Sequence, residues 1–115
     1  MALSKSEEKK IREAVGDYVE SKRPGPDIRP ELDIGFKITG QSFKIFEIRP
    51  DPRNPQRKME TPVAKATYVK SRRIWKLYWM RADLKWHRYE PLADTGVLEQ
   101  VLKEIDRDPY GCFWG

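Results

Sequence analysis

Aromatic rings and cations alternate between Arg72 and Glu90, and this stretch offers the clearest chemistry in the sequence. It holds three of the four tryptophans and the only histidine. Aromatic side chains can stack on bases while lysines and arginines contact phosphates, which is a common way to hold single-stranded nucleic acid. The same alternation also suits an antiparallel sheet with tryptophans toward its core and lysines toward solvent. The sequence leaves both readings open.

Positive charge is concentrated on this part of the chain. The net charge is +5, yet residues 61–90 carry eight basic and two acidic side chains, whereas residues 91–115 carry two basic and five acidic ones. This asymmetry favours an anionic partner, because a field of one sign attracts the opposite charge.

Strand-like alternation sorts these side chains into two faces. We expect a strand over residues 74–80, a turn at residues 81–83 and a further strand after it. The apolar side of these two strands is expected to consist of Trp75, Leu77, Trp79, Leu84 and Trp86. The candidate nucleic-acid-binding residues come from the opposite side of these strands, from the expected strand over residues 63–69 and from the turn before residue 74. They are Lys65, Lys70, Arg72, Arg73, Lys76, Tyr78, Lys85, His87 and Tyr89.

The rest of the chain predicts the elements that must position these faces. An amphipathic helix is expected over residues 4–20, with Ser4 and Glu7 at capping-box spacing. Apolar alternation predicts further strands over residues 31–38, 42–49 and 63–69. A second helix is expected through Leu98 and Ile105, capped by Asp94 or Thr95.

We therefore expect an α+β fold: an antiparallel sheet of about five strands, with an N-terminal and a C-terminal amphipathic helix packed on one face. Residues 1–115 form a single domain in this interpretation. Residues 1–30 are the first helix and a linker, residues 31–91 a β-meander, and residues 92–115 the second helix and an aromatic tip.

Two irregular segments are candidates for contacts with a protein partner. Residues 49–62 contain four prolines and are expected to form a solvated loop with no strand inside it. The tip, Cys112-Phe113-Trp114, is expected to fold back on the core, although aromatic residues also dominate interface cores.

Catalytic readings are weaker. Asp33 with Glu47-Ile48-Arg49 is loosely similar to the acidic residue and Glu-x-Lys of one class of magnesium nucleases, but Arg49 stands where that class has lysine and cannot lose its proton. His87 and Cys112 could form a base and thiolate pair only if the fold brought them together. We therefore expect no catalytic residues, no cofactor and no metal.

A cytoplasmic location is expected. No segment reaches the ~20 apolar residues of a membrane span, and the first ten residues lack the apolar stretch of a secretory signal. One cysteine cannot form an internal disulfide. The oligomeric state is not indicated.

Three motifs are similar to those of a bacterial family known as a domain of unknown function, DUF3024. They are Trp75-Lys-Leu-Tyr-Trp-Met, Trp86-His-Arg-Tyr-Glu-Pro and the ending Asp108-Pro-Tyr-Gly-Cys-Phe-Trp-Gly. The resemblance covers about Glu31 to Gly115. It implies a bacterial, cytosolic, stand-alone domain and supplies no activity, substrate or site residues.

The sequence thus favours a small basic binding module without catalysis, whose partner is anionic and most plausibly RNA or single-stranded DNA. One alternative is a protein-interaction module that uses the C-terminal tip or the proline-rich loop. The other is a metal-dependent, nuclease-like enzyme with Asp33 and Glu47 at its site.

Overall fold

The computed structural model describes residues 3–115; Met1 and Ala2, which belong to the stretch tested for a secretory signal, lie outside it. The elements follow the chain as α1 (Lys5–Lys22), β1 (Asp33–Thr39), β2 (Ser42–Asp51), β3 (Asn54–Val69), β4 (Ile74–Met80), β5 (Trp86–Arg88) and α2 (Leu98–Arg107). The strands form one antiparallel sheet in the order β1-β2-β3-β4-β5. The predicted α+β fold is confirmed.

Both helices present an apolar stripe to the sheet. In α1 the stripe is Ile11, Val15 and Val19. The predicted capping box is present, because Ser4 Oγ accepts a hydrogen bond from the Glu7 amide (3.1 Å) while Glu7 Oε1 accepts one from the Ser4 amide (2.8 Å). No helix in the described residues is both long and apolar enough to cross a membrane.

The predicted cap of α2 is wrong. Its N-cap is Val97, which makes no side-chain capping bond. Thr95 lies two residues earlier and accepts a hydrogen bond from the Val97 amide (3.1 Å), so its hydroxyl shapes the turn before the helix. Asp94 is drawn away from the helix by an ion pair with Arg88.

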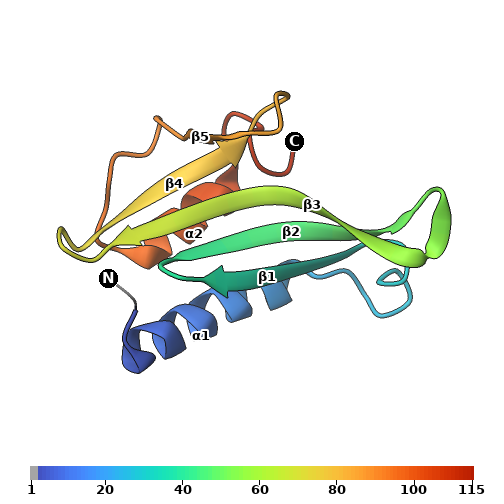
Figure 1. Ribbon diagram of the computed structural model, residues 1–115, viewed down its shortest axis with the longest axis horizontal. Coiled ribbons are helices and arrows are strands. Elements are labelled where there is room, and N and C mark those ends of the chain that lie inside the picture. Colours follow the sequence, from blue (N-terminus) through green and yellow to red (C-terminus); the bar gives the residue numbers. More distant parts are fainter. Residues whose placement is uncertain (1–2) are drawn as a thin grey trace.

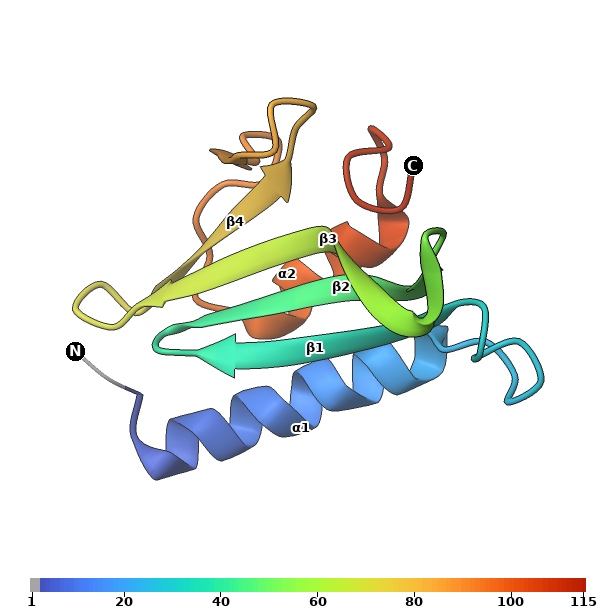
Figure 2. The same ribbon diagram turned by 45° about the vertical axis from the view of Figure 1, so that its right-hand side comes forward.

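One hydrophobic core joins both helices to one face of the sheet. It contains Phe43 and Ile45 of β2, Trp75 and Leu77 of β4, and residues of α1 and α2 such as Val15, Val101 and Ile105. Figures 1 and 2 show α2 behind the sheet and α1 running alongside β1. Within residues 3–115, neither helix lies on the opposite face of the sheet.

A bulge in β3 lets two neighbouring residues enter this core. The register with β2 shifts between Ile45 and Phe46, which pair with Ala64 and Pro62 and leave Val63 unpaired. Val63 and Ala64 are 2% and 0% exposed. An extra residue in one strand changes the parity of its side chains, which explains how adjacent residues reach the same core.

The prediction of an irregular loop over residues 49–62 is wrong. Strands β2 and β3 continue through most of this segment, and Pro50 pairs with Lys58 while Pro62 pairs with Phe46. Proline is tolerated here because both strands have a free edge in this segment. Strand β1 pairs with β2 only as far as Ile48, and β4 pairs with β3 only over residues 65–69.

The C-terminal tip folds back on the core, as expected. Asp108 ends α2 in a left-handed conformation (φ 42°), and its carboxylate accepts hydrogen bonds from the amides of Phe113 (3.0 Å), Trp114 (2.8 Å) and Gly115 (3.2 Å). Phe113 is buried against Tyr89. The side chain on which an interaction tip would depend is therefore already part of the core.

Candidate nucleic-acid interface

A row of four cations and one tyrosine crosses the face of the sheet that the helices leave open. Each member is paired with the next across neighbouring strands, in the order Lys37, Lys44, Lys65, Tyr78 and Arg88. In its own strand, each member has one neighbour before it and one after it on the helix-covered face. These neighbours are buried in the core or packed against it, or pair with residues of that face. Because successive side chains of a strand point to opposite faces, the whole row points away from the helices. We call these five residues the cationic row.

Two further rows flank the cationic row. On one side, Ser42 Oγ and Thr67 Oγ1 lie 2.7 Å apart, and Lys76 is the partner of Thr67. On the other side the surface is apolar, with Phe46 opposite Pro62 and Met80 opposite Trp86. The open face therefore changes from hydroxyl groups through cations to apolar rings.

Like charges placed directly opposite one another destabilise a sheet, and ion pairs offset this cost only at the two ends of the cationic row. Lys37 pairs with Glu60 (2.9 Å) and Arg88 pairs with Asp94. Within residues 3–115, neither Lys44, Lys65 nor Lys76 forms an ion pair. Three lysines at the centre of this face are therefore available to an external anion.

Tyr78 holds two members of the row in place. The Lys65 ammonium lies 5.6 Å from the centre of its ring, and the Arg88 guanidinium lies 5.7 Å from it. Both distances fall in the range of cation–π attraction. The ring is thus engaged by cations, and it orients them more than it offers a free surface for stacking.

Trp86 provides the freer aromatic surface. It borders a hollow of about 220 Å³, together with Lys37, Lys44, Phe46, Glu60 and Pro62. Among the described residues, Trp86 forms neither a ring–ring nor a cation–ring pair. The hollow combines an apolar wall with cations on its rim, which suits a flat ring attached to an anionic backbone.

The predicted faces of β5 are wrong. Trp86 pairs with Met80 and lies on the open face, whereas His87 pairs with Trp79 on the helix-covered face. Tyr89 is 1% exposed, and its hydroxyl donates to Glu104 Oε2 (2.6 Å). Leu84, which was expected to be apolar core, is 81% exposed in a turn. The register across the β4–β5 turn pairs Trp86 with Met80, so Trp86 takes the face of Met80 and not that of Trp79, and the residues after it alternate accordingly.

The predicted cations of the turns lie away from the row. Lys70 pairs with Glu7 of α1 (3.1 Å), which ties it to the helix-covered side. Arg72 and Arg73 are exposed in the β3–β4 turn, and Lys85 is exposed in the β4–β5 turn. Of the nine predicted binding residues, the open face of the strands brings together Lys65, Lys76 and Tyr78.

Among the interface residues absent from the predicted set are three cations and one tryptophan: Lys37, Lys44, Arg88 and Trp86. For two of them the signal was present, since Lys37 and Lys44 alternate with apolar residues in strands that the sequence already indicates. Trp86 and Arg88 could not be assigned, because their faces depend on the length of the turn before them.

The structure does not assemble the nuclease-like site. Asp33 pairs with Ile48, and Glu47 pairs with Ile34, so adjacent strands turn the two carboxylates to opposite faces. Arg23 donates to both oxygens of Asp33 (2.8 and 2.9 Å) and holds the pKa of that carboxyl below its usual value. No group of three metal-ligating side chains occurs within residues 3–115.

His87 and Cys112 line the same surface hollow, of about 340 Å³. Their chemistry does not match a base and thiolate pair. The His87 ring nitrogen Nε2 is engaged by Asp83 Oδ2 at 2.7 Å, and burial raises the pKa of the Cys112 thiol. A protonated thiol is a poor nucleophile.

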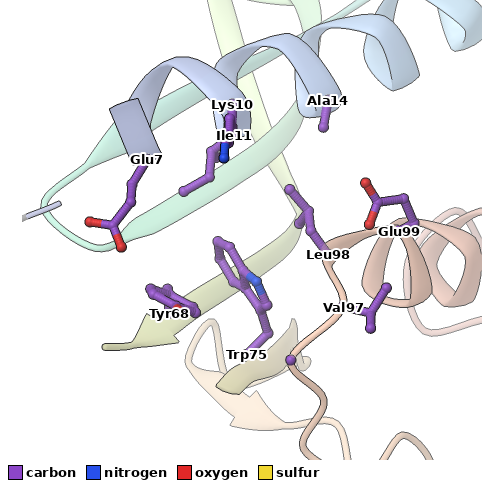
Figure 3. A pocket seen from close by; sticks show the side chains of 10 residues that line it. Glu7, Lys10, Ile11, Ala14, Tyr68, Trp75, Val97, Leu98 and Glu99 are labelled. Carbon is purple, nitrogen blue, oxygen red and sulfur yellow. The ribbon is translucent and has the colours of Figure 1, made fainter. Parts of the chain in front are cut away.

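A larger hollow of about 490 Å³ lies between α1 and the start of α2. Figure 3 shows Ile11, Trp75 and Leu98 pointing into it, with Glu7 and Glu99 at its edge. Glu7 is already engaged by the Ser4 amide and Lys70. The apolar side chains that line this hollow, Ile11, Trp75 and Leu98, belong to the hydrophobic core or pack against it.

Comparisons with known proteins bear on the family alone. Neither the search of curated proteins nor the search of solved structures finds a match to this chain. A family model described as Domain of unknown function (DUF3024) matches residues 3–115, which is nearly the whole chain. The protein therefore belongs to the DUF3024 family.

Proposed function

We propose that the protein is a binding module without catalysis that holds single-stranded nucleic acid, RNA or DNA, on the open face of its sheet. The cationic row, with four cations on the five strands, carries this proposal. With neighbouring strands ~4.8 Å apart, the row is about 19 Å long, which matches an extended segment of a phosphate backbone rather than a single small anion.

The chemistry divides between the rows. Lys44 and Lys65 lie on the central strands and contact phosphates, with Lys76 beside them. Trp86 stacks on a base that enters the neighbouring hollow. The hydroxyl groups of Ser42 and Thr67 donate hydrogen bonds to phosphate or sugar oxygens, or accept them from sugar hydroxyl groups. Contacts of this kind do not discriminate strongly between bases, so weak sequence preference is expected.

The proposal predicts binding that falls with salt, with a Kd of about 1–100 μM at physiological ionic strength. Each phosphate contact with a single strand contributes about 0.7 to the slope of log K against log salt. Replacing Lys44, Lys65 and Lys76 by glutamine should therefore reduce the slope by about 2 and weaken binding at low salt. Fluorescence anisotropy with short labelled oligonucleotides measures both quantities.

A matched control removes the same charge from the helices. Lys5, Lys9 and Lys103 are exposed on α1 and α2 and form no ion pair within the described residues. Their triple glutamine variant should keep the wild-type slope. Equal losses in the two triple variants would mean that net charge alone drives binding, and no binding by the wild type at low salt would sink the proposal.

A further inference from the structure

Strands β2 and β3 extend beyond the rest of the sheet and form a projecting ribbon. Pairing with β1 ends at Ile48, and β4 pairs with β3 only over residues 65–69. Residues 49–60, which we call the arm, therefore form a two-stranded hairpin with two free edges. Figure 1 shows the arm at one end of the molecule, beyond both helices.

The arm makes no contribution to the core. None of its residues belongs to the hydrophobic core, and residues 52–62 are all exposed. Its root is braced by Lys58, whose ammonium donates to the Pro30 carbonyl (2.6 Å). At its tip, Asp51 Oδ1 accepts from the Arg53 amide (2.9 Å). Isolated two-stranded hairpins are marginally stable, so these contacts fix a shape that folding of the core does not require.

The charges of the arm are mostly positive, and two of its four cations are engaged, because Arg49 pairs with Glu47 (3.6 Å) and Lys58 donates to the Pro30 carbonyl. It carries four basic and two acidic side chains. Both acids are engaged, since Asp51 accepts from the Arg53 amide and Glu60 pairs with Lys37. Within residues 3–115, the guanidinium groups of Arg53 and Arg57 form no ion pair.

The prolines of the arm exclude one class of partner. Pro50, Pro52 and Pro55 lack amide hydrogens, and prolines on a strand edge hinder pairing with another strand. Strand addition by a peptide or by a second copy of the chain is therefore disfavoured. A cationic ribbon with two free edges is left, and a groove with anionic walls is complementary to it in charge.

We infer that the arm lies in the major groove of duplex DNA while the open face holds the adjoining single strand, so that the partner is a junction between duplex and single-stranded DNA. This inference rests on the proposed function of the open face. The major groove of B-DNA is about 12 Å wide and admits a two-stranded β-ribbon, whereas the major groove of A-form RNA is too deep and narrow for side chains to read. Arg53 and Arg57 contact phosphates on the groove walls.

The test compares one single strand, the same strand as a tail on a DNA duplex, and the same tail on an RNA duplex, by anisotropy over a salt series. Wild type should bind the tailed DNA duplex more tightly than the strand alone. Arg53→Gln with Arg57→Gln should remove this advantage and reduce the salt slope for the tailed duplex by about 1.8, at 0.9 per contact with B-DNA. The same variant should bind the single strand as wild type does.

Lys9→Gln with Arg107→Gln removes equal charge from the helices and serves as the control. If the arm variant keeps the advantage of the tailed duplex, or if wild type shows no such advantage, the arm inference fails while the open-face proposal stands. Equal affinity for the tailed RNA duplex would overturn the assignment to DNA. Failure of wild type to bind the single strand would instead refute the proposed function, and the junction inference with it.

Discussion

Tryptophan has two separate roles in this sheet. Trp75 is 5% exposed and contacts Phe43 edge to face, with ring centroids 5.6 Å apart. Trp86 lies half-buried on the opposite face, beside the hollow that Lys44 also borders. A ring enclosed by neighbours contributes packing, whereas a ring with an open side can take a new partner. We therefore expect Trp75 to serve folding and Trp86 to serve the proposed binding.

Alanine at each position should reveal this separation. Trp75→Ala leaves a large cavity in the core and should lower the free energy of unfolding by about 3–5 kcal/mol. Trp86→Ala should cost about 1 kcal/mol or less, but it should weaken oligonucleotide binding by about 1–3 kcal/mol if the ring stacks on a base. Urea denaturation gives the first quantity and anisotropy titration the second.

The opposite pattern would overturn the assignment of faces. A Trp86→Ala variant that unfolds readily and a Trp75→Ala variant that stays stable would mean that the two rings have exchanged roles. If Trp86→Ala is stable and binds oligonucleotides as tightly as wild type, the open face does not use this ring.

Tyr89 shows how a polar ring can replace an apolar one in the core. Its hydroxyl donates to Glu104 and its ring lies 4.9 Å from that of Phe113. Burial raises the pKa of the hydroxyl, so it stays protonated and remains a donor. A tyrosine with a satisfied hydroxyl packs as phenylalanine does, and the sequence pattern alone could not distinguish this from an exposed tyrosine.

At the level of elements, the central strands accept electrostatic repulsion. Lys44 is directly opposite Lys37 on β1 and Lys65 on β3. Cross-strand like charges are destabilising, and folding alone gives no reason for three lysines in adjacent positions. A surface that binds anions does give one, because the partner neutralises the repulsion.

Lys44→Gln should therefore stabilise the protein at low ionic strength. We expect a gain of about 0.5 kcal/mol in the free energy of unfolding, since two like-charge neighbours are relieved at once. The gain should vanish near 1 M salt, where charges more than about 3 Å apart are screened. Urea denaturation at both salt concentrations measures it, with Lys103→Gln on α2 as the control. A loss of stability at low salt would contradict the repulsion argument.

Local periodicity was enough to predict most elements but not how they are joined. The alternation of apolar residues in residues 74–80 and the stripe of Ile11, Val15 and Val19 identify β4 and α1 correctly, because one buried face imposes each period. The face of Trp86 depends instead on the β4–β5 turn, where Leu84 takes a left-handed conformation (φ 61°). Such a turn length is not encoded in hydrophobic alternation.

The arm was missed for a different reason. Its strands bury no side chain, so they show no apolar alternation, and their prolines indicate a loop. Its pairing is set by continuation of β2 and β3 from the sheet, which is a property of the fold and not of the local sequence. The cationic row was only half visible for the same reason, since cross-strand register decides which lysines are neighbours.

At the level of the whole molecule, the two faces of the sheet are specialised. Both helices and the core lie on one side, and the cationic row lies on the other. One ion pair joins the end of α1 to the first strand, where Arg23 donates two hydrogen bonds to Asp33. Asp33 begins the strand that also carries Lys37, and neither Arg23 nor Asp33 belongs to the cationic row.

The joint makes stability depend on pH in the acid range. Because Arg23 lowers the pKa of Asp33 in the folded state, the unfolded chain takes up a proton at Asp33 first as pH falls. The contribution of the pair is therefore complete above the unfolded pKa of about 3.9 and is lost as pH falls through the lower folded value. Asp33→Asn should have a lower Tm than wild type at pH 7, and the difference should shrink below about pH 4.

Thermal unfolding followed by circular dichroism from neutral to acid pH measures this difference. Glu7 and Asp83 also have lowered pKa values, through the Ser4 amide and His87 respectively, so wild type and Asp33→Asn should both still lose stability in acid, with the smaller loss in the variant. A difference in Tm that stays constant from pH 7 to acid would mean that Asp33 stabilises the fold through its shape and not through its charge.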